Sequence, residues 1–180
     1  MVPSISKARV SGVRPWPMKT TLRSAPASFR AWPTPSAQRI AVDAQRLSDD
    51  AAYAQTIQDG ICAGLRSGQH VLAYTAPANG QATNTASAAR VAQASADLIA
   101  RVVQARTDHG TPLRRVGIAG GDTSSHAVQA LRLWGLSYLA TICPGVTLSR
   151  AHTARDGLEL MLKGGQMGGV DLFEQLLGGF

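Results

Sequence analysis

Residues 116–125 read VGIAGGDTSS, and this stretch decides the fold class of the chain. An apolar strand, expected at 115–119, runs directly into Gly120 and Gly121, and a segment with helical spacing follows. A strand that turns through glycines into a helix is a building unit of α/β proteins. The stretch therefore predicts an α/β domain, in which ligands bind where the carboxyl ends of strands meet the amino ends of helices.

The chain from about Arg39 onward repeats this alternation of strands and helices. Its pattern predicts a mostly parallel sheet flanked by helices, in the form of a Rossmann-like three-layer lobe. Strands are expected at 40–42, 70–75, 115–119, 138–142 and 158–162, and a loop is expected at 77–80. Four helices are expected: one from Ser48–Asp50 to about Gly68, one long helix with Val91, Ala94, Leu98 and Val102 on its core face, and two at 127–133 and 170–177.

The chain divides into two parts that differ in charge. The net charge is +7, but residues 1–39 hold seven basic side chains and no acidic one, whereas residues 40–180 hold eleven of each sign. Residues 1–38 also contain six of the nine prolines, which predicts an irregular, basic and poorly ordered leader ahead of a domain at 39–180. Such a composition is also typical of a transit segment, and an altered beginning of a longer reading frame is the alternative explanation.

The composition argues against several classes of partner. Because residues 40–180 carry no excess of positive charge, we expect no nucleic acid to bind there. No run of 18 apolar residues occurs, so we expect no membrane partner. Cys62 and Cys143 are far apart and belong to no Cys/His cluster, which predicts two reduced thiols, a cytoplasmic location and no metal held by protein ligands.

The first candidate binding loop follows the strand at 115–119. Gly120 and Gly121 let the backbone approach a ligand, and the free N–H groups of a helix's first turn suit a phosphate. Asp122 follows the glycines, and the hydroxyls of Thr123 and Ser124 can bond phosphate or sugar oxygens. The alternative is structural, since one of these three polar side chains could simply cap the helix.

A second glycine loop follows the strand expected at 158–162. Lys163 is the only lysine between residues 20 and 180, and it precedes Gly164 and Gly165. An ammonium beside glycine amides suits phosphate oxygens, although a surface lysine at a strand end is the alternative. His126 and His152 lack partners at catalytic spacing, so the sequence identifies no catalytic residue.

These stretches together resemble the C-terminal nucleotide-binding domain of the four-carbon acid sugar kinases. The residues that carry the resemblance are 116–125, the Pro144–Gly145 turn with Arg150 after it, and residues 160–169, which read LMLKGGQMGG. The similarity covers roughly residues 40–180. Members of this family use ATP to phosphorylate sugar acids of the 3-oxo-tetronate, threonate and erythronate type.

The resemblance implies a site and its cofactors. Gly121, Asp122, Thr123 and Ser124 would line the ATP phosphates, and Gly164 with Gly165 would close the site from the other loop. Charge places Lys163 beside the same phosphates, and Gly120 belongs to the turn that forms the first loop. Phosphoryl transfer implies Mg²⁺ in addition to ATP. A homodimer is compatible with this reading.

The resemblance also implies that part of the enzyme lies elsewhere. Family members carry a large N-terminal domain that binds the sugar acid, so this chain is expected to be a fragment that needs a substrate domain in trans. The family's first strand and its Gly-Ser loop have only a remnant here, at Val10–Gly12, with Val13 in place of the serine. Whether the isolated chain is a kinase is therefore open, and the alternative is a non-catalytic nucleotide- or anion-binding module.

Overall fold

The structure is a computed structural model that describes residues 37–76, 85–154, 157–165, 167–169 and 171–178. Residues 1–36 of the predicted leader and the predicted loop at 77–80 lie outside the described residues, whereas Ala37 and Gln38 belong to a strand; the domain boundaries stay a prediction. The strands are β1 (Ala37–Asp43), β2 (His70–Ala76), β3 (Arg115–Ala119), β4 (Gly135–Cys143), β5 (Val146–His152) and β6 (Glu159–Lys163), and the helices are α2 (Ala44–Asp49), α3 (Ala51–Arg66), α4 (Thr85–Asp108), α5 (Gly121–Ala130) and α6 (Leu172–Gly178).

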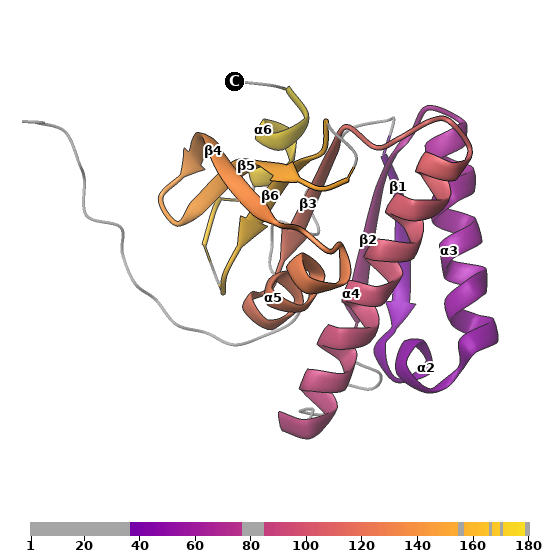
Figure 1. Ribbon diagram of the computed structural model, residues 1–180. Coiled ribbons are helices and arrows are strands. Elements are labelled where there is room, and N and C mark those ends of the chain that lie inside the picture. The colour runs from indigo at the N-terminus through magenta and orange to yellow at the C-terminus, as the bar shows by residue number, and fades with distance from the viewer. Residues whose placement is uncertain (1–36, 77–84, 155–156, 166, 170, 179–180) are drawn as a thin grey trace, which may run out of the picture.

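The strands form two sheets. In the first, β1 pairs with β2 in parallel, and in the second the order is β3-β6-β5-β4. The pair β3 and β6 is parallel, whereas β5 is antiparallel to both of its neighbours, β4 and β6. Figure 1 shows that β3 is the strand of the second sheet on the side of the β1–β2 pair.

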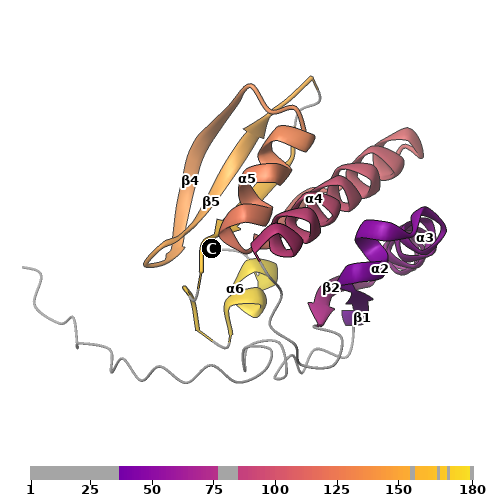
Figure 2. The ribbon, with the colours of Figure 1, turned by 90° about the horizontal axis from the view of Figure 1, so that it is seen from below.

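Helices lie on both faces of these strands. The long helix α4 contacts both α3 and α5, and these three helices lie on one face, while the short α6 lies on the other (Figures 1 and 2). The α/β class predicted from the sequence is confirmed. The hairpin of β4 and β5 adds antiparallel pairing that the alternating pattern did not indicate.

Local sequence explains the ends of the well-predicted helices. The Asp50 carboxylate accepts a hydrogen bond from the Tyr53 backbone N–H at 2.9 Å, which caps α3 as the Ser48–Asp50 pattern indicates. This bond lowers the pKa of Asp50, because it favours the ionised carboxylate. Beyond the other end of α3, Gly68 has a φ of 76°, where a side chain would be strained.

The second sheet is held by an apolar core beneath α6. Met161 of β6 is fully buried there, and Leu172 and Phe173 of α6 pack with it and with strand β5, whereas the equally buried Leu160 packs with Ala151 and Leu158. Arg115 ties the same elements together, because its guanidinium donates to the Glu159 carboxylate and to a carbonyl of α6. This packing fixes β3 and β6 side by side, with their carboxyl ends together.

Two local predictions differ from the structure. The helix expected at 127–133 begins at Gly121, so residues 121–124 form its first turn rather than a loop ahead of it. The first turn of this helix has no apolar periodicity in its side chains, and the prediction relied on that periodicity. The predicted helix therefore began too late in the chain. In addition, residues after Gly145 form the strand β5, which was not expected.

None of the helices in the described ranges is both long enough and apolar enough to span a membrane.

Candidate functional site

The first site element is the junction between β3 and α5. Gly120 has φ 115° and ψ 127°, a conformation that an L side chain rarely adopts. Within the described chain no side-chain hydrogen bond caps α5, and the Gly120 carbonyl accepts from the Ser124 N–H at 2.9 Å. The capping role considered from the sequence is therefore not realised, and first-turn amides of α5 remain open to a ligand.

The side chains of the first turn differ in exposure. Ser124 is 9% exposed, and its Oγ has no hydrogen-bond partner among the described residues. Thr123 is half-buried, and Asp122 is exposed and supplies the only acidic group of the turn. A buried hydroxyl without a partner is costly, so Ser124 Oγ has an unused hydrogen-bonding capacity in the first turn of α5.

The register between β3 and β6 brings the second loop to the first. Ala119 pairs with Lys163, and the Gly120 N–H donates to the Lys163 carbonyl at 3.0 Å. Both strands run in the same direction, so the chain leaves each of them at the same edge of the sheet. The two glycine loops predicted from separate parts of the sequence therefore lie side by side.

Lys163 is folded back over its own loop. Its Nζ donates to the Gly165 carbonyl at 2.8 Å, which leaves further N–H groups of the ammonium available. Burial lowers the pKa of Lys163, while the nearby Cys143 thiol opposes this shift. Burial likewise raises the pKa of Cys143, against the effect of the Lys163 charge. A partly desolvated ammonium gains by meeting an anion.

The glycines of both loops border open space. Among the described residues, a Cβ built on Gly121, Gly164 or Gly165 would meet no atom within 4 Å beyond its chain neighbours and its own helix backbone. These glycines are therefore not required by internal crowding, although the φ of 50° at Gly165 also favours glycine there. The two loops leave room for a group that approaches the backbone closely, as a phosphate does.

The histidines stay outside this cluster of interactions. His152 lies in β5, and its Nε2 is 2.6 Å from Ser137 Oγ on β4. His126 is half-buried on α5, and no interaction with the second loop is recorded for it among the described residues. Sequence reasoning missed Cys143 as a neighbour of Lys163, because only the β4–β5 hairpin, with Cys143 opposite Val146, brings it there.

The arrangement can bind an anion, and its chemistry is that of a phosphate cradle. It combines a helix N-terminus, a buried hydroxyl, an ammonium and two glycine turns at one edge of a partly parallel sheet. In the described part of the chain, no group of three or more His, Cys, Asp or Glu side chains could hold a metal ion. Fold and site together give an α/β lobe whose two glycine loops lie side by side at one end of a partly parallel sheet.

Comparison with known families identifies the lobe. The family described as the nucleotide-binding C-terminal domain matches residues 28–173, and the chain belongs to this family. This match and the curated relatives agree with the four-carbon acid sugar kinases inferred from the two glycine loops.

Two curated relatives are kinases of sugar acids. The chain is 38% identical over 89 residues to the 3-oxo-isoapionate kinase of Paraburkholderia graminis, a match to 48% of this chain and 18% of that protein. It is 44% identical over 64 residues to the 3-oxo-tetronate kinase of Cupriavidus necator, covering 36% of this chain and 15% of the relative. The chain thus corresponds to less than a fifth of either relative.

Two solved structures share the fold. A Haemophilus influenzae protein superposes with a TM-score of 0.69 at 23% identity, over 84% of this chain and 36% of its own. A Bordetella bronchiseptica protein, solved with bound citrate as a domain-swapped dimer, gives a TM-score of 0.63 at 24% identity, over 83% of this chain and 36% of its own.

Proposed function

We propose that this chain is the ATP-binding lobe of a four-carbon acid sugar kinase. The lobe would hold ATP while a substrate domain, supplied in trans, presents a sugar acid of the 3-oxo-tetronate, threonate or erythronate type. The curated relatives support this class, since they are kinases of 3-oxo-isoapionate and 3-oxo-tetronate. The two free thiols, Cys62 and Cys143, fit the reducing cytoplasm.

One observation carries the proposal: the hydrogen bond from the Gly120 N–H to the Lys163 carbonyl joins the two glycine loops. In this proposal the amides of α5 and the ammonium of Lys163 would contact one ligand from the two joined loops. A nucleoside triphosphate needs contacts from more than one side, since its negative charge extends over several oxygens. A single helix terminus would not distinguish it from any small anion.

Each residue has a role in this proposal. The amides of Gly121 and of the residues after it would bind phosphate oxygens, and Ser124 Oγ would donate to one of them. Lys163, Gly164 and Gly165 would close the opposite side. When bound, Mg²⁺ would neutralise phosphate charge, and the exposed carboxylate of Asp122 would be an oxygen ligand for it.

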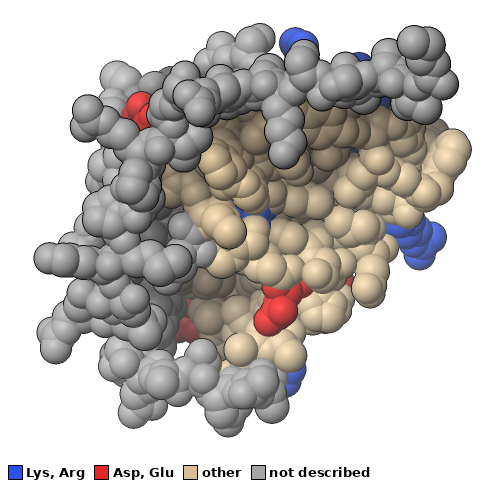
Figure 3. Space-filling model, turned by 90° about the vertical axis from the view of Figure 1, so that its left-hand side faces the viewer, with Lys and Arg blue, Asp and Glu red and all other residues tan. Residues whose placement is uncertain are grey.

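The β4 face is suited to contact the substrate domain. Two large apolar side chains on or beside β4 are strongly exposed, Trp134 at 76% and Tyr138 at 66%. Figure 3 shows the molecule from the β4 side, and the described atoms there are mostly uncharged. Exposed apolar patches of this kind are typical of protein contacts. A homodimer is a further use of such a surface, and the Bordetella relative is a domain-swapped dimer.

Calorimetry with the full chain and Mg-ATP tests the proposal. The double variant Gly121→Val, Gly164→Val should abolish binding, because its side chains enter the open space of both loops. Neither glycine has a positive φ, and neither Cβ would meet an atom within 4 Å, so the fold should survive. Gly60→Val on α3 is the matched control, since its Cβ would make only an ordinary contact with Ile40 and should leave binding unchanged.

Three outcomes are informative. Binding by the wild type that is lost in the double variant and kept in the control supports the ATP lobe. Equal binding by all three proteins contradicts this site. No binding by a folded wild type contradicts the nucleotide function itself.

A second candidate function is a non-catalytic nucleotide- or anion-binding module. It is favoured by the small number of acidic groups at the site, since Asp122 is the only acidic residue in the first turn of α5. A phosphoryl-transfer assay distinguishes the two candidate functions. It uses Mg-ATP and 3-oxo-tetronate together with the separately produced N-terminal domain of a relative. Turnover supports the kinase, whereas nucleotide binding without turnover supports the module.

A further inference from the structure

The two sheets face each other across a groove. A cavity of about 500 Å³ lies between β2 and β3, and consecutive residues of both strands line it, 70–75 and 115–119. The order of the sheets gives β2 a partner only in β1, and β3 a partner only in β6, among the strands that the structure describes. Two strand edges therefore border one cavity.

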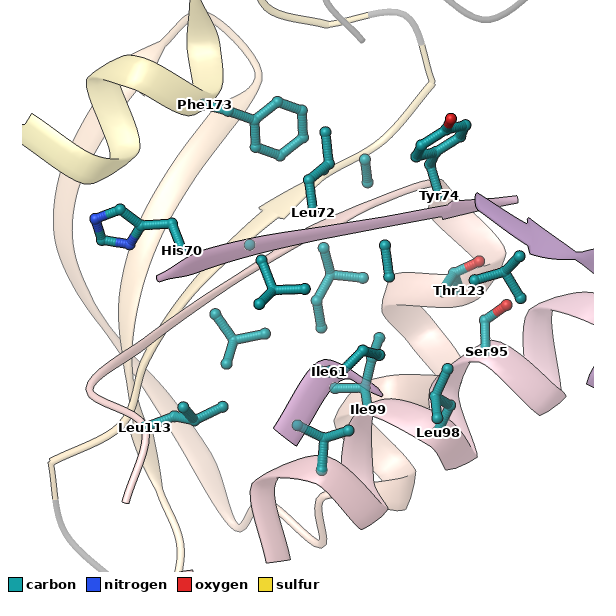
Figure 4. Close-up of a pocket in the computed structure, with 18 of the residues that line it drawn as sticks. Ile61, His70, Leu72, Tyr74, Ser95, Leu98, Ile99, Leu113, Thr123 and Phe173 are labelled. Atoms are coloured by element: carbon teal, nitrogen blue, oxygen red, sulfur yellow. The ribbon is translucent and has the colours of Figure 1, made fainter. Parts of the chain in front are cut away.

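The two bordering strands run in the same direction. Figure 4 places His70 of β2 and Leu113, just before β3, at one end of the cavity, and Tyr74 and Thr123, just after β3, at the other. A strand laid between them in parallel could pair its backbone with both edges, as the middle strand of a parallel sheet does. Its carboxyl end would come out beside α5.

Both faces of the groove are apolar. Leu98 of α4 lies on one face and Phe173 of α6 on the other (Figure 4), and Val102 of α4 and Leu176 of α6 also line the cavity. A strand inserted here would have its side chains buried in both directions, as in parallel sheets generally. Its occupant must therefore be uncharged on both faces, and it must lack proline, which cannot donate to a ladder.

The leader of this chain offers no such segment. Within residues 1–36 the longest run without a charge or a proline is Val10–Val13, which is shorter than the five residues of β3. A second copy has the same leader, and exchange of strands between two copies leaves the number of strands in each lobe unchanged. The occupant is therefore sought in a different polypeptide.

The length of the relatives supports this source. The solved Haemophilus protein matches this chain over only 36% of its own length, so related lobes belong to much longer polypeptides. We propose that the groove between β2 and β3 binds one extended segment of another polypeptide, about five uncharged and proline-free residues long, as a parallel strand bonded to both edges. This proposal does not depend on nucleotide binding.

A synthetic peptide tests the groove in the full chain without nucleotide. The probe has the sequence Lys-Lys-Gly-Val-Ala-Val-Val-Val-Gly-Lys-Lys, in which the end lysines keep an apolar pentamer soluble. We expect it to bind, measured by calorimetry, and to slow hydrogen exchange of the amides in 71–73 and 116–118. The same peptide with proline as the central residue of the pentamer should bind at least about tenfold more weakly, since it loses a ladder donor.

A matched pair of protein variants locates the binding. Ala73 is exposed and lines the groove, so Ala73→Asp should weaken peptide binding at least about tenfold by placing a charge against the apolar segment. Ala41 is an exposed alanine of β1 that does not line the groove, and Ala41→Asp should bind the peptide as the wild type does. Circular dichroism checks that both variants fold.

Several results would overturn the proposal. These are the absence of peptide binding, equal binding of the proline peptide, equal binding by the Ala73→Asp variant, or slower exchange in segments other than 71–73 and 116–118. Protection of both segments before any peptide is added, lost on removal of residues 1–36, would also overturn it, because the leader would then be the occupant.

Discussion

Replacing Lys163 by methionine isolates the charge of the second loop. Methionine keeps an unbranched apolar stem of similar length and removes the ammonium, together with its hydrogen bond to the Gly165 carbonyl. The backbone bond between the Gly120 N–H and the Lys163 carbonyl does not involve the side chain and should persist. The variant therefore tests the ammonium while the two loops stay joined.

The expected loss follows from one hydrogen bond to a charged partner. Such a bond contributes about 1.5–3 kcal/mol, which corresponds to a Kd for Mg-ATP raised about 10- to 150-fold. Lys163→Arg keeps a cation and should lose less. Because burial lowers the pKa of Lys163 from its ordinary 10.5, the wild type should lose affinity as the pH rises towards that lowered pKa. The arginine variant should keep its affinity in the same range, since its guanidinium stays protonated.

Calorimetry at two pH values provides the assay. At pH 7 both the wild type and the arginine variant should bind Mg-ATP, and the methionine variant should bind weakly. At the second, higher pH, closer to the ordinary lysine pKa of 10.5, the wild type should lose affinity relative to the arginine variant. If the methionine variant binds within twofold of the wild type at pH 7 while it remains folded, the ammonium takes no part in nucleotide binding and the reasoning fails.

Two further predictions concern the frame around the site. Gly145 has a φ of 79°, and a Cβ at this position would lie 2.9 Å from Met167 Sδ. Gly145→Ala should therefore lower the free energy of unfolding by about 1–2 kcal/mol, measured by urea denaturation. An unchanged urea midpoint would contradict this. Arg115 donates from Nε to the Glu159 carboxylate at 2.7 Å and from Nη1 to the Leu176 carbonyl at 2.6 Å. Arg115→Met should therefore lower the free energy of unfolding by about 1–3 kcal/mol and speed hydrogen exchange of the amides in α6. Exchange in α6 as slow as in the wild type would show that Arg115 does not hold this helix.

Local signals explain which parts of the fold were predictable. Asp50 caps α3 through a bond to Tyr53 N–H, three residues away, and such short-range chemistry is visible in a sequence. Strand β5 was missed because its burial alternates imperfectly, with Leu148 and Ser149 buried in succession. Its pairing with β4 also contains bulges, which no local pattern indicates.

The candidate site was predictable as two loops but not as one place. The glycines and Lys163 stand out in the sequence, whereas their proximity depends on the pairing of Ala119 with Lys163 across a long separation. The open space above the loops and the unpartnered hydroxyl of Ser124 are tertiary facts for the same reason. The groove between β2 and β3 likewise belongs to no single stretch of the chain.

The register between β3 and β6 has a consequence for how this lobe can change in length. The hairpin β4–β5 lies between the two loops in the chain, and residues added at its turn would leave Ala119 opposite Lys163. Loss of one residue inside β3 or β6 would instead slide the two glycine turns past each other by about 3.3 Å and reverse the faces of that strand. Insertions between the loops should therefore be tolerated, whereas a single deletion within either five-residue strand should separate the two halves of the phosphate cradle.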